Sequence, residues 1–169
     1  MIRYCLEKWD KNKDKLKEFL AQDKHLKECN YEYLIKLVVE IILNDELVIN
    51  EYGKEDKMWD SEKITIIARH DRYEGTMLFL IPRKKREPFE TDYLMGYTNY
   101  GTCSICDTLI YIQEAGPYED ELPTEQQLLD YMMLCKDFVC SIIRPYNKGM
   151  HYEEIFDEVT MDDTIRFIV

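Results

Sequence analysis

Apolar residues recur at every third or fourth position in three stretches of the chain, residues 2–20, 31–44 and 125–143. This spacing places them on one side of a helix, so each stretch is predicted to be an amphipathic helix. The third stretch also has a clear start, because Thr124 and Gln127 have the spacing of a capping box. The pattern therefore predicts two N-terminal helices and one long helix further along the chain.

β-branched and aromatic residues dominate three other stretches, residues 63–70, 76–81 and 93–100. Such residues favour strands. Short polar segments separate the stretches, and Gly75 lies where a hairpin turn favours glycine. Three strands joined by short turns indicate an antiparallel meander. Residues 46–52 have weaker strand character.

The segments between these elements are less regular. Residues 53–61 are charged and are predicted to form a loop. Residues 107–113 have β-branched residues that favour a strand, whereas Ser104, three residues before Asp107, favours a helix N-cap. We predict a short helix there, because the chain must change direction after the third strand. Residues 164–169 have the pattern of a last edge strand.

These elements together predict an α+β fold. An antiparallel meander sheet of three to five strands would pack against the long helix, with the N-terminal helices alongside, because every apolar stripe then has a partner. The length of 169 residues fits one domain, residues 1–169. Within it, residues 1–45 are an alternative unit, a helical appendage whose removal would leave the sheet intact.

The charge of the chain is strongly negative, with 34 Asp and Glu against 22 Lys and Arg and a net charge of −12. Such a surface repels nucleic acid and anionic membranes on average, and it favours a partner protein with a basic surface or serves solubility alone. No apolar run is long enough to cross a membrane, and the start is charged too early for a signal peptide. We therefore expect a cytoplasmic protein with no direct nucleic-acid or membrane partner.

Two acidic clusters are the candidate binding residues for a basic partner. They are Glu119, Asp120 and Glu121 in one loop, and Glu153, Glu154, Asp157 and Glu158 in the C-terminal tail. The one dense basic run, residues 83–86, is a candidate phosphate grip, although a solvated hairpin tip is the commoner role of such a run. Neither feature includes a recognisable catalytic motif, and no catalytic residue is assigned.

Cys103 and Cys106 form the one Cys-x-x-Cys pair of the chain. In a cytoplasmic protein the cysteines are expected to be free thiols or metal ligands rather than disulfides. One interpretation is structural, with small apolar side chains packed at a tight turn. A second is zinc binding, but a zinc site takes about four ligands. Cys135, Cys140 or His151 would have to complete such a mixed site.

A third interpretation of the Cys103–Cys106 pair is redox chemistry. A thiol at the start of a helix has a lowered pKa, because unpaired backbone N–H groups favour the thiolate. The flanking sequence lacks the Trp-Cys-Gly-Pro-Cys pattern of thioredoxin-like enzymes, and Asp107 would oppose a nearby thiolate. The structural, zinc and redox interpretations therefore all stay open. We expect no cofactor, with zinc as the alternative.

The segment around this pair is Tyr-Gly-Thr-Cys-Ser-Ile-Cys-Asp, residues 100–107. It resembles a Tyr-Gly-Ser-Cys-Ser-Gly-Cys-Asp signature of small acidic phage and prophage proteins of uncharacterised function, and the similarity extends over residues 63–143. The chain departs from the signature at Thr102 and Ile105, and Ile105 in place of glycine argues against an essential close backbone approach there. The resemblance implies a phage accessory setting and supplies no catalytic residues.

The functional hypothesis that follows is a non-enzymatic, phage-type interaction protein that binds a host protein with a basic surface. Its sharpest form is inhibition of a nucleic-acid-binding defence system, as anti-CRISPR proteins do. The alternatives are a thiol redox or zinc protein that uses Cys103 and Cys106, and an unrecognised hydrolase.

Overall fold

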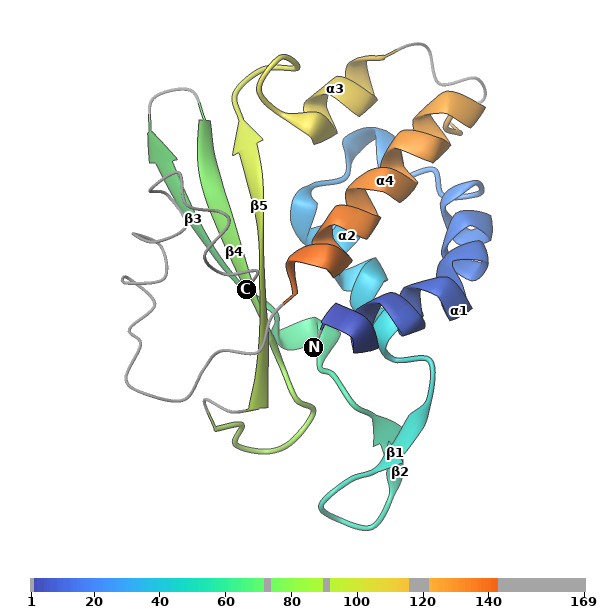
Figure 1. Cartoon of the computed structure of the whole chain (residues 1–169), viewed down its shortest axis with the longest axis vertical. Coiled ribbons are helices and arrows are strands. Elements are labelled where there is room, and N and C mark those ends of the chain that lie inside the picture. The colour runs from blue at the N-terminus through green and yellow to red at the C-terminus, as the bar shows by residue number, and fades with distance from the viewer. Residues whose placement is uncertain (1, 72–73, 90–91, 116–121, 143–169) are drawn as a thin grey trace.

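Helices cover one face of a three-stranded antiparallel sheet in the computed structural model of the chain (Figure 1). The structure describes residues 2–71, 74–89, 92–115 and 122–142. This arrangement confirms the predicted α+β class, with a long helix packed on a sheet.

The sheet consists of β3 (Thr65–Asp71), β4 (Glu74–Pro82) and β5 (Tyr93–Gly101). Their order in space is β3-β4-β5, and both pairs are antiparallel. The register places Leu78 of β4 opposite Ile67 on one side and Tyr97 on the other. The predicted meander is therefore confirmed, while positions 72–73 of its first turn and the strand predicted at 164–169 lie outside the described residues.

The first helix, α1, extends over Ile2–Leu20 as predicted, and a short turn η1 (Leu26–Glu28) follows it. The second begins as α2 (Tyr31–Leu37). The helix predicted over 31–44 is present, but after Leu37 it widens into the π-helical segment η2 (Val38–Leu43), which the apolar spacing did not indicate. The Asn44 N–H donates to the Val39 carbonyl at 2.9 Å, five residues back, and this bond closes the wider turn.

A two-stranded hairpin, β1 (Leu47–Ile49) with β2 (Glu55–Lys57), extends from the body of the molecule (Figure 1). The prediction that residues 53–61 form a loop is therefore wrong for Glu55–Lys57, which form β2. No local pattern indicated this strand, because its residues do not alternate between apolar and polar. The turn between the two strands brings them together. In this turn the Asn50 side chain accepts hydrogen bonds from the N–H groups of Tyr52 and Lys54, at 3.0 Å each. Gly53 has a φ of +73°, which glycine adopts without strain.

The helix α4 (Glu125–Ser141) lies against the sheet (Figure 1), and its buried Phe138 contacts both the sheet and α2. The Phe138 ring meets Phe79 of β4 with centroids 6.1 Å apart, and Tyr31 of α2 with centroids 6.0 Å apart. Buried residues of α1, including Trp9 and Leu16, belong to the same apolar cluster. The N-terminal helices and the sheet thus share one hydrophobic core.

Candidate functional site

The Cys103–Cys106 turn joins the end of β5 to the start of α3 (Thr108–Glu114), at the top of the molecule in Figure 1. Backbone bonds close the turn, because the N–H groups of Cys106 and Asp107 donate to the Cys103 carbonyl at 3.1 and 2.9 Å. The helix predicted after the turn is present. Its N-cap is Asp107 and not Ser104, because the Asp107 side chain accepts the N–H of Ile110 at 2.9 Å.

Asp107 also fixes the position of the turn relative to the rest of the fold. Its side chain is buried, and its Oδ2 accepts the Gly101 N–H at 2.8 Å. Its Oδ1 accepts the hydroxyl of Tyr31 at 3.0 Å. Burial and then the negative charge of Asp107 raise the pKa of Tyr31, so that hydroxyl stays protonated and remains a donor. The carboxylate is therefore held by the strand, the helix and α2 together.

Gly101 gives the turn the room that it needs. A Cβ atom at this position would lie 2.5 Å from Sγ of Cys106 and 2.7 Å from the Cys106 carbonyl oxygen. Both distances are shorter than a van der Waals contact. Any residue with a Cβ atom at position 101 would therefore displace the backbone at Cys106. The close approach in this turn occurs at Gly101, and Ile105, where the sequence argued against one, is 97% exposed.

The two thiols of the pair face each other at the surface. The Sγ atoms of Cys103 and Cys106 lie 3.1 Å apart, with Cys103 exposed and Cys106 half-buried. A hydrogen bond with the Cys106 thiol, and then bonds from the backbone N–H groups of Ile105 and Cys106, lower the pKa of Cys103. The thiolate is the reactive form of cysteine, so this geometry favours reaction at Cys103.

Three other cysteines have the opposite character. Burial raises the pKa of Cys5 to about 11 and that of Cys29 to about 12, and it raises the pKa of Cys135 further. These thiols stay protonated near neutral pH. Cys140, on α4, is exposed and free.

A metal site would need more ligands than the two sulfur atoms of the turn. Within the described ranges, no three side chains of the His, Cys, Asp and Glu types gather around a common point. Cys135 is fully buried in the core and Cys140 is exposed on α4, and neither belongs to such a group. His151, the other ligand considered from the sequence, lies outside the described residues.

The acidic candidates for partner binding all lie outside the described residues. They are Glu119, Asp120, Glu121, Glu153, Glu154, Asp157 and Glu158. The residue that the sequence analysis missed at the turn is Tyr31, which lies 76 positions before its partner Asp107. The sequence held one local signal for this site, Asp107 at the end of the motif. An aspartate directly before a helix is a preferred N-cap, so its role as the cap of α3 could have been predicted.

Comparison of the chain with protein-family models, with characterised proteins and with solved structures gives no significant match. In the part of the chain that the structure describes, none of the helices has the length and apolar character that a membrane crossing requires. The turn itself is therefore the feature with the clearest chemistry, because an exposed thiol with a lowered pKa lies against a second thiol there.

Proposed function

We propose that this protein undergoes thiol–disulfide exchange through Cys103 and Cys106. The observation that carries the proposal is the 3.1 Å separation of the two Sγ atoms at an exposed turn. The lowered pKa of Cys103 supports it, because exchange begins with a thiolate. The Asp107 carboxylate is held by Tyr31, Gly101 and Ile110, and the carboxylate whose charge acts on Cys103 is that of Glu114.

The reaction has two steps and consumes a disulfide substrate. The Cys103 thiolate attacks one sulfur of the substrate disulfide, forms a mixed disulfide and releases the other substrate sulfur as a thiolate. The Cys106 thiol loses its proton to solvent and attacks Sγ of Cys103, which releases the second substrate thiolate. Two electrons pass from the protein to the substrate, and the protein keeps an internal Cys103–Cys106 disulfide.

Alkylation as a function of pH tests the proposal, with Cys140 as the internal comparison because it is also exposed. We expect Cys103 to be modified at lower pH than Cys140. In mixtures of reduced and oxidised glutathione, the parent and Cys140→Ser should form the Cys103–Cys106 disulfide reversibly. Cys103→Ser and Cys106→Ser should not. Mass spectrometry detects this disulfide as the loss of two hydrogen atoms. Equal pH profiles for Cys103 and Cys140, with no internal disulfide, would contradict the proposal.

Zinc binding is the competing use of the same two thiols. Elemental analysis of the purified protein separates the two, and we expect no zinc. About one equivalent of zinc, lost in Cys106→Ser, would support the metal-site interpretation instead.

We propose as a second candidate the phage-type acidic interaction protein, located in the bacterial cytoplasm and bound to a host protein with a basic surface. An inhibitor of a nucleic-acid-binding defence system is its sharpest form. The net charge of −12 favours it, together with the resemblance of residues 100–107 to a phage signature. Attraction to a basic partner would be screened over about 8–10 Å at ordinary salt.

Affinity capture from a bacterial lysate, followed by binding at increasing salt, tests this second candidate. We expect association to slow as salt rises. Neutralising residues 119–121, or the four acidic residues of 153–158, should reproduce the loss at low salt. Affinity indifferent to salt and to both sets of substitutions would remove the support for it.

A further inference from the structure

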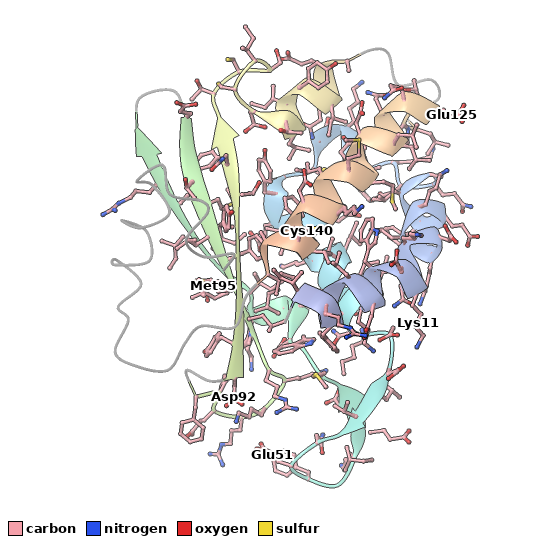
Figure 2. The ribbon with its side chains drawn as sticks, viewed as in Figure 1. Lys11, Glu51, Asp92, Met95, Glu125 and Cys140 are labelled. Atoms are coloured by element: carbon pink, nitrogen blue, oxygen red, sulfur yellow. The ribbon has the colours of Figure 1, made fainter. Side chains whose placement is uncertain are left out.

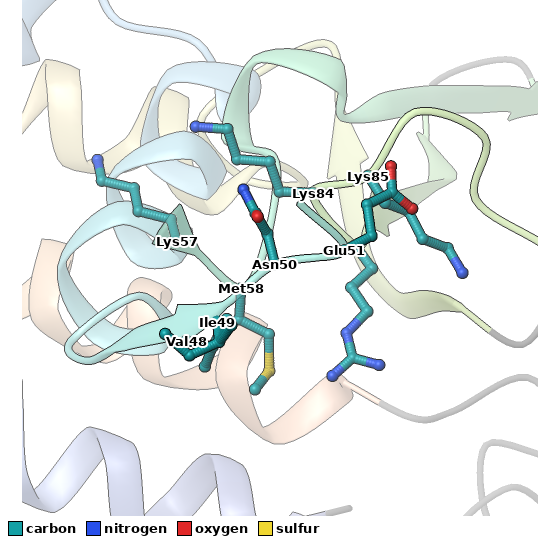
Figure 3. Close-up of a pocket in the computed structure, with 9 residues that line it drawn as sticks. Val48, Ile49, Asn50, Glu51, Lys57, Met58, Lys84 and Lys85 are labelled. Atoms are coloured by element: carbon teal, nitrogen blue, oxygen red, sulfur yellow. The ribbon is translucent and has the colours of Figure 1, made fainter. Parts of the chain in front are cut away.

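A cavity of about 290 Å³ lies between the β1–β2 hairpin and the segment that follows β4 (Figure 3). Hydrogen bonds tie its two sides together. The Lys84 N–H donates to the Met58 carbonyl at 2.9 Å, and the Arg86 N–H donates to Oε1 of Glu51 at 3.2 Å. Glu51 lies in the turn between β1 and β2, and Asp92 directly precedes β5. Figure 2 shows both residues at the same end of the molecule. The cavity is thus a product of the fold and not of one loop.

The lining is rich in positive charge, although the chain as a whole is acidic. Lys57 comes from β2, and Arg83, Lys84 and Lys85 come from the segment after β4. Among the described residues that line the cavity, Glu51 is the one acidic side chain. The basic run that the sequence analysis compared with a solvated hairpin tip therefore forms one wall of a pocket.

Each lysine of the pocket is held by a carboxylate that does not line it. The pairs are Lys57 with Glu40, Lys84 with Asp56 and Lys85 with Asp92. In Figure 3 the Lys57 and Lys84 side chains extend in the same direction, and Lys85 extends away from them. These pairs position the lysines and cancel much of their charge, so the lysines assist an anion and do not anchor it.

Arg83 differs from the lysines because, among the described residues, no carboxylate lies within ion-pair distance of its guanidinium, although its charge acts on Asp92, the partner of Lys85. Its backbone is fixed, since its N–H donates to the Asp92 carbonyl at 2.7 Å and it forms a β-bridge with the buried Trp59. Its side chain is exposed. A guanidinium in this position has its planar set of donors available for a phosphate or carboxylate, which it can bind through two hydrogen bonds.

The other wall of the pocket is apolar. Val48, Ile49 and Met58 line it, and Ile49 is 68% exposed. Apolar area beside a guanidinium that forms no close ion pair with the described residues suits a ligand with an anionic head and an apolar or planar body. The volume of about 290 Å³ lies just below the range of about 300–1,000 Å³ that is typical of ligand pockets. A monophosphate with a small body fits this size better than a dinucleotide.

The acidic surface restricts the ligand to small molecules. A nucleic-acid strand would extend over the rest of the molecule, whose net charge of −12 repels it. A small anion near Arg83 is shielded from distant charges, because salt screens them beyond about 8–10 Å. We propose that this pocket binds a small phosphate monoester, with the phosphate on Arg83 and its organic body against Ile49 and Met58.

Binding of phenyl phosphate and of inorganic phosphate to the full chain, followed by calorimetry and methyl NMR, tests the proposal. We expect phenyl phosphate to bind more tightly, because only it covers the apolar wall, and to shift the signals of Ile49 and Met58. Arg83→Gln should weaken phenyl phosphate binding about tenfold or more. The matched control is Arg86→Gln, which removes the same charge from the same run at a residue that does not line the pocket.

The control should keep its affinity within about twofold, and thermal melting should show that both variants are folded. Equal losses in Arg83→Gln and Arg86→Gln would mean that a diffuse basic segment attracts the anion, which overturns the proposal. Absence of binding by either probe at millimolar concentration, or NMR shifts confined to other parts of the molecule, would overturn it as well.

Discussion

The hydroxyl of Tyr31, the first residue of α2, donates a hydrogen bond of 3.0 Å to Oδ1 of Asp107, the residue that caps α3. The same hydroxyl accepts the Leu109 N–H at 3.4 Å. Two helices far apart in the sequence are therefore joined at a buried polar contact directly beneath the Cys103–Cys106 turn. Stability of the fold and placement of the thiols depend on the same bond.

The first prediction concerns this bond. Tyr31→Phe removes one of the three hydrogen bonds to the buried Asp107 carboxylate, and it removes the hydroxyl that accepts the Leu109 N–H. We expect the free energy of unfolding to fall by about 1–3 kcal/mol. Tyr111→Phe is the control, because Tyr111 is 55% exposed and the change there should be within about 0.5 kcal/mol. Chemical denaturation measures both, and equal effects would contradict the role of Tyr31.

The start of α4 supplies the second prediction. The predicted capping box is confirmed, since Gln127 N–H donates to Oγ1 of Thr124 at 3.3 Å and Thr124 N–H donates to Oε1 of Gln127 at 3.1 Å. Thr124→Ala should cost about 1 kcal/mol. Gln127→Ala should cost more, about 2 kcal/mol, because the buried Gln127 also donates to the Ile112 carbonyl at 2.9 Å.

The exposed neighbour Gln126 serves as the control for these two variants. Its side chain bonds to Asp130 one turn away at the surface, so Gln126→Ala should change the denaturation midpoint little. A midpoint for Thr124→Ala that equals that of the parent would show that the cap contributes nothing.

The third prediction compares two cysteines on α4. Cys135 is fully buried and Cys140 is exposed. Cys135→Asp places a charge in the core and should cost more than about 3 kcal/mol or prevent folding. Cys140→Asp adds the same charge at the surface and should cost less than about 1 kcal/mol. Thermal melts that do not separate the two variants would mean that the buried face of α4 is assigned wrongly.

The fourth prediction is a dependence of stability on pH at Asp45. Burial alone would raise the pKa of Asp45, but hydrogen bonds from Lys8 and Lys11 outweigh it and lower that pKa from 3.8 to about 2. The folded state therefore binds this proton less readily than the unfolded state. The stabilisation is complete above the unfolded pKa and is lost as the pH falls through the folded one, from about 4 to about 2.

Asp45→Asn tests the pH dependence directly. At neutral pH the variant should be less stable than the parent by about 2 kcal/mol, and the difference should shrink toward pH 2. Asp10→Asn is the control, because the Asp10–Lys13 pair is exposed and such pairs contribute little. A stability difference for Asp45→Asn that does not change between pH 7 and pH 2 would refute the assignment.

The fifth prediction concerns residues 1–45, which the sequence left as a separable appendage. Trp9, Leu16 and Tyr31 lie in the same core as Phe79 and Phe138. Deleting residues 1–45 would expose the inner face of α4, so we expect the fragment to lose cooperative unfolding and to bind a hydrophobic dye. A fragment that melts cooperatively and retains its sheet would instead support the appendage.

Much of the fold could be predicted from local patterns. Helical spacing of apolar residues identified α1, α2 and α4, and runs of β-branched residues separated by turn residues identified β3, β4 and β5. The cap at Thr124 was predictable because it involves residues three positions apart. The cap at Asp107 was misplaced to Ser104, because several residues of the turn have side chains that can cap a helix, and only the observed geometry distinguishes them.

The sequence by itself determined the class of the fold, the antiparallel meander and the presence of two neighbouring thiols in a turn, because each depends on residues close together in the chain. Only the tertiary structure decided that Tyr31 reaches Asp107, that β2 pairs with β1, and that Arg83 lines a cavity with Lys57. These contacts join residues distant in sequence or lacking a periodic signal. They form because burial of the shared core brings the helices and strands together, and no local pattern records which side chains then meet.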